Sequence, residues 1–207
     1  MACGDVKARF RIVILDPALT LSAPRLVTAV SGIDAITHAV ETYVTTKRTP
    51  MSKIFSREAW RLLESNFMAV LEQPSNLEAR SGMLLGAHLA GIAIEQSMLG
   101  AAHACANPLT AHYSMAHGIA VGLMLPHVIR FNQTLVGNDY NELAPDLSDR
   151  IIAMKEAASL PQRLSECGVK QDRLPELAHE AAEEWTGKFN PRPVTEADFL
   201  RLYEAAF

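Results

Sequence analysis

Cysteine is scarce in this chain: Cys3, Cys105 and Cys167 are the only three and lie far apart in the sequence. An odd number of widely separated cysteines does not form a disulfide framework, so we expect a reducing, cytoplasmic location. The first ten residues are polar and charged and do not resemble a secretory signal. Residues 1–9 therefore read as a disordered or tag-like start.

An excess of charge of one sign and a long apolar run are also missing. The formal net charge is −4, which excludes the basic surface that nucleic acid or an anionic membrane would require. The apolar stretch 119–128 is too short to cross a bilayer, and Pro126 and His127 lie within it. We expect neither a nucleic-acid nor a membrane partner.

The sequence has no glycine-rich turn of the kind that follows a strand, opens a helix and binds a pyrophosphate. Its 11 glycines are scattered through helical and loop contexts. No residue of this chain is therefore assigned to binding a nucleotide cofactor, and no catalytic residue is assigned outside the metal site considered below.

Helical periodicity covers most of what remains. The pattern predicts an all-α fold, a multi-helix bundle that forms one domain over residues 10–207. Residues 10–17 are rich in β-branched side chains and predict one short N-terminal strand or an extended segment. Helices are expected over residues 22–30, 34–45, 52–71, 77–96, 151–164, 174–185 and 195–207, with a break at Gly32 and a loop at 137–139.

Four of the seven histidines lie in the apolar, almost uncharged segment 100–132: His103, His112, His117 and His127. Interior imidazoles are either hydrogen-bonded core groups or ligands. His103 and His117 would lie about 21 Å apart on one straight helix. To share an ion, the chain must turn back between them, and we expect one helix to end near Asn107, before Pro108, and another to begin near His117.

A second segment supplies candidate partners for these histidines. In GIDAITHAVETY, residues 32–43, Asp34 and His38 are spaced i and i+4 and share a helix face. One carboxylate and three imidazoles, from Asp34, His38, His103 and His117, suit Fe²⁺, Zn²⁺ or another first-row divalent ion. From spacing alone, the alternative that these are satisfied core or capping groups stays open.

The two segments together resemble the metal-binding segments of the iron-containing alcohol dehydrogenase family, which shares the dehydroquinate synthase-like fold. The family pattern is an Asp-Ala-x-x-His-Ala-x-Glu helix followed by His-x13-His-Gly and Leu-Pro-x5-Asn. The matching residues are Asp34, His38, Glu41, His103, His117, Gly118, Leu125, Pro126 and Asn132. The resemblance implies the C-terminal helical domain and assigns Asp34, His38, His103 and His117 as the ligands.

The resemblance also implies a function. The metal, Fe²⁺ first and Zn²⁺ as the alternative, would act as a Lewis acid on an alcohol or aldehyde oxygen, with NAD(P) as hydride carrier. NAD(P) would be bound by an N-terminal nucleotide-binding domain that we expect to be absent here, so the chain alone should be inactive. Apolar surface left uncovered by that domain predicts a homo-oligomer.

Two alternative functions stay open. One is a non-enzymatic helical module with a structural metal site, suggested by the missing cofactor half. The other is part of a maleylacetate-reductase-like enzyme, suggested by Asn107, where the family often carries a second histidine. An amide can hydrogen-bond a substrate, but it does not relay a proton at neutral pH.

Overall fold

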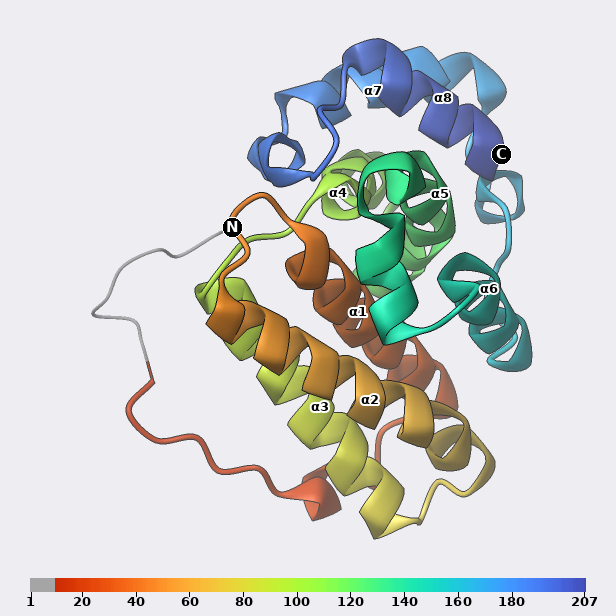
Figure 1. Ribbon diagram of the computed structural model, residues 1–207. Helices are drawn as coiled ribbons and strands as arrows, with labels where there is room; N and C mark the ends of the chain where they lie inside the picture. The colour runs from red at the N-terminus through yellow and green to blue at the C-terminus, as the bar shows by residue number, and fades with distance from the viewer. Residues whose placement is uncertain (1–9) are drawn as a thin grey trace.

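The structure is a computed structural model that describes residues 10–207, and these residues form a helical bundle (Figure 1). The α-helices are α1 (Arg25–Val44), α2 (Pro50–Glu72), α3 (Leu77–Glu95), α4 (Ala101–Tyr113), α5 (His117–Leu143), α6 (Leu147–Ala157), α7 (Leu174–Glu183) and α8 (Glu196–Ala206). Short 3-10 turns are η2 (Pro17–Thr20), η3 (Leu164–Cys167), η4 (Gln171–Arg173) and η5 (Trp185–Phe189). The predicted all-α class is confirmed. The expected start over residues 1–9 lies outside the described residues.

The helices pack in three groups (Figure 1). Helices α1, α2 and α3 contact one another along their lengths. Helices α4 and α5 form a pair, and α5 also packs on α1, so α1 lies between two groups. Helices α7 and α8 form a pair that covers α4 and α5, while α6 packs beside α5. This arrangement brings α1, α4 and the start of α5 together in the interior.

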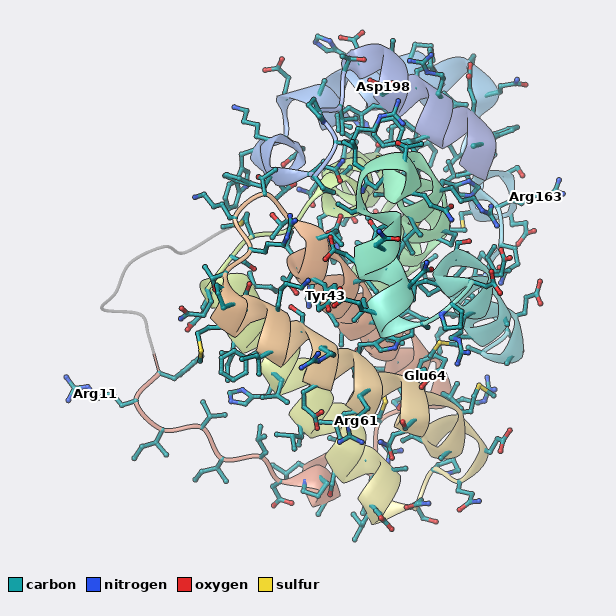
Figure 2. All side chains as sticks on the ribbon, viewed as in Figure 1. Arg11, Tyr43, Arg61, Glu64, Arg163 and Asp198 are labelled. Carbon is teal, nitrogen blue, oxygen red and sulfur yellow. The ribbon has the colours of Figure 1, made fainter. Side chains whose placement is uncertain are left out.

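No strand forms within residues 10–207, so the strand alternative for the N-terminal segment is wrong. No neighbouring strand offers backbone partners there, and a single strand has no ladder to join. The segment runs beside the bundle instead, and Arg11 points away from it (Figure 2). Its apolar side chains are largely exposed, with Ile12 at 80% and Ile14 at 86%.

The expected break at Gly32 does not occur, because α1 runs continuously from Arg25 to Val44. A Cβ at Gly32 would lie 2.8 Å from Phe67 Cε2, so the glycine allows α2 to approach closely rather than ending a helix. One helix therefore carries Asp34, His38 and Glu41, at intervals of four and three residues on a single face.

The predicted helix end near Asn107 is also wrong. Helix α4 continues through Pro108 to Tyr113 and ends at Ser114, which has a left-handed backbone with φ of 49°. The chain reverses over residues 114–116, and α5 begins at His117, as predicted. This reversal returns the chain to the site, so His117 lies near His103 despite the thirteen residues between them.

Helix α5 extends to Leu143, so the loop expected at residues 137–139 is wrong; a kink with non-helical backbone angles lies at Val136 instead. By length and composition alone, α5 is apolar enough to cross a membrane. Most of its apolar stretch is buried within the bundle, and core helices of globular proteins pass the same test. The expectation of no membrane partner stays a prediction.

Other helix ends follow local sequence. Asn76 accepts a hydrogen bond from the Ala79 N–H and starts α3, and Thr195 with Asp198 forms a capping box at α8. Thr49 caps α2 at Pro50, two residues earlier than expected. Helix α6 ends at Ala157, well before the expected residue 164, and α7 gives way to η5 at Trp185.

Candidate metal centre

Three helices deliver four candidate ligands to one place. Asp34 and His38 lie one turn apart on α1, His103 lies in the first turn of α4, and His117 is the first residue of α5. The structure therefore brings together all four residues that the sequence pointed to. The turn at residues 114–116 makes this possible by reversing the chain between α4 and α5.

The distances converge on one atom, Asp34 Oδ1. The Nε2 atoms of the three histidines lie 3.4 Å (His38), 3.7 Å (His103) and 3.8 Å (His117) from it. Two ligand atoms each about 2.1 Å from one tetrahedral ion are roughly 3.4 Å apart. Ligand atoms of Asp34, His103 and His117 all lie within 4.8 Å of one another, whereas His38 is close to Asp34 but falls outside that mutual group. These separations match a shared cation better than direct hydrogen bonds.

The imidazole rings enclose the site on one side and leave it open on the other. The rings of His38 and His103 are stacked, with centroids 4.9 Å apart, and the ring of His117 lies 5.3 Å from that of His103 at a tilt of 50°. The His103 side chain is 5% exposed, whereas that of His117 is 38% exposed. A small molecule would reach the cluster from the side of His117.

Two buried atoms in the cluster lack hydrogen-bond partners: Asp34 Oδ1 and His103 Nε2. Buried polar atoms are rarely left without a partner, because losing hydration without compensation costs free energy. These two atoms face one another at 3.7 Å, too far for a good hydrogen bond. A divalent cation would satisfy both, so the residues present fit a metal ion.

The electrostatics are those of crowded, buried groups. Burial, together with the nearby charge on His103, lowers the pKa of His38 to about 4. Burial also lowers the pKa of His117. For His103, burial alone would lower the pKa, but the Glu41 and Asp34 carboxylates raise it to about 9. For the acid Asp34, burial acts in the opposite direction and raises the pKa. The three imidazoles nevertheless hold the pKa of Asp34 below its ordinary value.

Glu41 is part of the sequence motif and also lies at the site, although the sequence alone assigns it no role. Glu41 is 4% exposed, and its Oε2 lies 2.5 Å from His103 Nδ1. The signal was present in the sequence, because Glu41 follows His38 by three residues and Asp34 by seven, which puts all three on one helix face.

The remaining histidines lie elsewhere. His127 and the half-buried His88 do not join the cluster, although burial lowers the pKa of His127 to about 4. His112 belongs to a second group with Glu176 and Glu180. That group is more exposed, and its His112 Nε2 already lies at hydrogen-bond distance, 2.8 Å, from Glu180 Oε1.

Asn107 lies four residues after His103, one turn further along α4. Its Nδ2 donates a hydrogen bond of 2.9 Å to Glu184 Oε2, between α7 and η5. The amide is thus held by a carboxylate from another element, and Asn107 itself lies one helical turn from His103.

Comparison with known proteins points to one family. Residues 28–207 match the model described as "Fe-containing alcohol dehydrogenase family, C-terminal". The chain is 33% identical to a 1,3-propanediol dehydrogenase of Klebsiella pneumoniae over 210 residues, covering 94% of this chain and 54% of that protein. It is 27% identical to an NAD-dependent methanol dehydrogenase of Bacillus methanolicus, covering 98% of this chain and 57% of the relative.

Solved structures agree on the fold. A crystal structure of 1,3-propanediol oxidoreductase superimposes with a TM-score of 0.88 at 30% identity, covering 93% of this chain and 55% of that one. An alcohol dehydrogenase from Oenococcus oeni gives a TM-score of 0.87 at 29% identity, with 93% and 54% coverage. The chain thus spans about half the length of the relatives that it matches.

Proposed function

The chain belongs to the Fe-containing alcohol dehydrogenase family and forms its C-terminal helical domain, and from this premise we propose that it is the metal-binding part of an NAD(P)-dependent oxidoreductase of alcohols and aldehydes. Asp34, His38, His103 and His117 are the proposed ligands. Fe²⁺ is the proposed ion, with Zn²⁺ as the alternative, because one carboxylate and three imidazoles suit both.

The observation that supports this proposal best is the pair of buried, unpartnered atoms Asp34 Oδ1 and His103 Nε2. They lie among imidazole nitrogens at separations that a shared cation produces, whereas the second His–Glu group has its hydrogen bonds already made. A cluster of core residues without an ion would leave these two atoms uncompensated.

The residues of this chain would bind the ion and orient what approaches it. A bound divalent cation supplies Lewis acidity, which lowers the pKa of an alcohol and polarises an aldehyde carbonyl. Asp34 would offset part of the cation's charge, and the stacked rings of His38 and His103 would hold two nitrogens in place for it. The more exposed side of the cluster, at His117, leaves room for a substrate oxygen.

Hydride transfer also needs a nicotinamide, and no glycine-rich phosphate-binding turn is found in these 207 residues. Because the relatives are about twice as long as the match, we place the NAD(P) site in the part of the family that this chain does not match. The isolated chain is then expected to bind metal without turning over alcohols.

Two assays on the purified chain test the proposal. Reconstitution with Fe²⁺ or Zn²⁺ followed by metal analysis should give one ion per chain, and His112→Ala should leave that ion in place. A turnover assay with primary alcohols and NAD or NADP should give no activity. Failure to retain any divalent ion would overturn the metal site, and robust turnover would overturn the placement of the NAD(P) site.

A non-enzymatic module in which the ion only stabilises the fold is the second candidate. The openness of the cluster at His117 argues against it, because structural sites are usually closed. Joining this chain to a nicotinamide-binding half and assaying alcohol oxidation separates the two candidates. Restored turnover supports the enzyme.

The maleylacetate-reductase-like alternative is disfavoured by the Asn107–Glu184 pair. The Glu184 carboxylate that accepts from Asn107 places negative charge beside that residue, which disfavours an anionic keto acid there, whereas a carboxylate accepts a hydrogen bond from a hydroxyl group. We therefore propose neutral alcohols and aldehydes as substrates. Substrate profiling of the joined protein tests this, and a clear preference for unsaturated keto acids would reverse it.

We also propose a cytoplasmic location and self-association. A cytoplasmic location fits the free thiols of Cys105 and Cys167. Self-association fits the exposed apolar side chains before α1, which include Phe10, Ile12 and Ile14.

A further inference from the structure

Glu41 uses both of its carboxylate oxygens inside the bundle. Its Oε2 lies 2.5 Å from His103 Nδ1, and its Oε1 accepts a hydrogen bond of 2.7 Å from the Ala102 N–H. The residue is 4% exposed, so water does not compete for these oxygens. One side chain of α1 therefore contacts both the backbone and the imidazole in the first turn of α4.

The start of α4 explains why this contact is needed. Gly100 occupies the N-cap position and supplies no side-chain acceptor, which leaves the first N–H groups of the helix to find partners outside it. Glu41 Oε1 accepts a hydrogen bond from the Ala102 N–H, and Asn190 Oδ1 accepts one of 3.4 Å from the Ala101 N–H. A carboxylate at this position also complements the positive end of the helix dipole.

Gly100 itself permits the approach. A Cβ at this position would lie 3.1 Å from Glu41 Oε1 and 3.2 Å from Asn190 Oδ1, tighter than ordinary contact. The backbone of α4 thus sits directly against the Glu41 carboxylate. This fixes the distance between α1, which carries Asp34 and His38, and α4, which carries His103.

The Glu41 carboxylate also determines which nitrogen of the His103 ring carries the proton. Because Glu41 has no proton to give when ionised, Nδ1 must be the donor in this contact. Nε2 is then at the opposite end of the ring, where it faces Asp34 Oδ1 at 3.7 Å. A histidine that donates through one nitrogen to a carboxylate keeps its other nitrogen oriented for a metal ion.

We propose that Glu41 is a positioning residue for the metal centre, an inference that rests on the proposed function. It acts through His103 and the start of α4, and it does not touch the ion. It holds Nδ1 as a donor, directs Nε2 at the ion, and fixes the register between the two helices that carry three of the four ligands.

Glu41→Gln is the sharpest variant because it preserves shape. Gln has one acceptor oxygen and one NH₂ group, while Glu41 accepts from two donors, His103 Nδ1–H and Ala102 N–H. One donor must lose its acceptor. If the NH₂ group faces the ring, Nδ1 becomes the acceptor and Nε2 carries the proton, which blocks metal binding.

Co²⁺ titrated into the full chain and followed by its visible absorption is the first measurement. All variants carry His112→Ala, which removes the exposed His112–Glu176–Glu180 group as a competing site. Glu41→Gln is expected to weaken Co²⁺ binding about 10- to 100-fold, the range for losing such a partner. Asn190→Ala is the matched control: it removes the other outside acceptor at the start of α4 and should lower the melting temperature without changing Co²⁺ affinity.

A second measurement needs no metal. In metal-free protein labelled with ¹⁵N-histidine, the His103 Nδ1–H proton should give a far-downfield, slowly exchanging signal, assigned by its loss in His103→Ala. It should persist in Asn190→Ala and vanish in Glu41→Gln.

The outcomes separate the two proposals. Equal Co²⁺ affinity for Glu41→Gln and its parent, or no protected Nδ1–H signal in the unaltered chain, overturns the role of Glu41 and leaves the metal site standing. If the parent binds no Co²⁺ at all, the proposed function fails, and the role of Glu41 at a metal centre fails with it.

Discussion

Gly118 lies so close to Val30 that a Cβ on the glycine would be 2.1 Å from the Val30 carbonyl oxygen. Gly118 is the second residue of α5, directly after His117, and Val30 lies one turn before Asp34 on α1. Contact between the two backbones therefore sets how near His117 comes to Asp34. The glycine is present for this approach and not for backbone flexibility, since its helix continues without a break there.

Gly118→Ala should separate α5 from α1 at the candidate metal centre. We expect a loss of about 1–3 kcal/mol in unfolding free energy, as for other overpacked sites, together with weaker metal binding. Chemical denaturation and Co²⁺ titration measure the two effects. Gly91→Ala is the control, because a Cβ there meets nothing within 4 Å, and it should be neutral or stabilising. Equal behaviour of the two variants would contradict the account.

Metal binding should stabilise the fold. An ion present at about 100 times its dissociation constant adds about 2.7 kcal/mol to the unfolding free energy. We expect Zn²⁺ or Co²⁺ to raise the melting temperature of the chain, and the rise to disappear in His103→Ala and Asp34→Ala. His112→Ala should keep it. A rise that survives in His103→Ala but is lost in His112→Ala would move the site to the exposed cluster.

Lys155 on α6 gives a pH-dependent prediction away from the metal. It is 3% exposed, and burial lowers its pKa from 10.5 to about 8, although Glu166, Cys167 and Glu156 partly oppose this. Between pH 8 and 10.5 the unfolded chain holds more protons at this site than the folded chain, so stability rises with pH there. Below pH 8 both states are charged and the cost of burying the charge, about 3 kcal/mol, is fully present.

Lys155→Met should therefore raise the unfolding free energy at pH 7, by up to about 3 kcal/mol, and the gain should shrink as the pH rises above 8. Thermal unfolding at pH 7 and 9.5 measures this. The exposed Lys170 provides the control, and Lys170→Met should show no such trend. A Lys155→Met chain that is less stable at pH 7 would contradict this, because it would show that interactions in the folded protein outweigh the cost of burying the Lys155 charge.

The segment before α1 predicts self-association. Ile12 and Ile14 are 80% and 86% exposed. Association of two or more chains would remove this apolar surface from water, which is favourable. Light scattering after size exclusion should show a mass above one chain at micromolar concentration, and a double change of Ile12 and Ile14 to Ser should reduce it. A monomer at every concentration speaks against this.

Much of the fold was predictable because apolar periodicity and caps are local signals. Asn76 and the Thr195–Asp198 capping box mark true helix starts. The helix break predicted at Gly32 and the helix end predicted before Pro108 are wrong. Both residue types usually interrupt helices, but tertiary packing outweighs that preference here. Gly32 is a contact point for Phe67, which lies 35 residues away and is invisible to a local pattern.

The sequence named the residues that the structure brings together as a candidate site, but it did not show which residues support them; that they bind a metal stays a prediction. Spacing and resemblance named Asp34, His38, His103 and His117, since i,i+4 pairs and the His–x13–His interval are written in the sequence. The role of Glu41 depends on where α4 begins relative to α1, and the approach at Gly118 depends on how α5 crosses α1. Both are relations between helices, which no single segment encodes.

The central claim, that one carboxylate and three imidazoles bind a single cation, is tested most directly by anomalous diffraction from crystals of the chain grown with Fe²⁺ or Zn²⁺. We predict one peak at the metal's absorption edge, about 2.0–2.2 Å from Asp34 Oδ1 and from Nε2 of His38, His103 and His117. The absence of a peak among these four side chains, or a peak only at His112, Glu176 and Glu180, would contradict it.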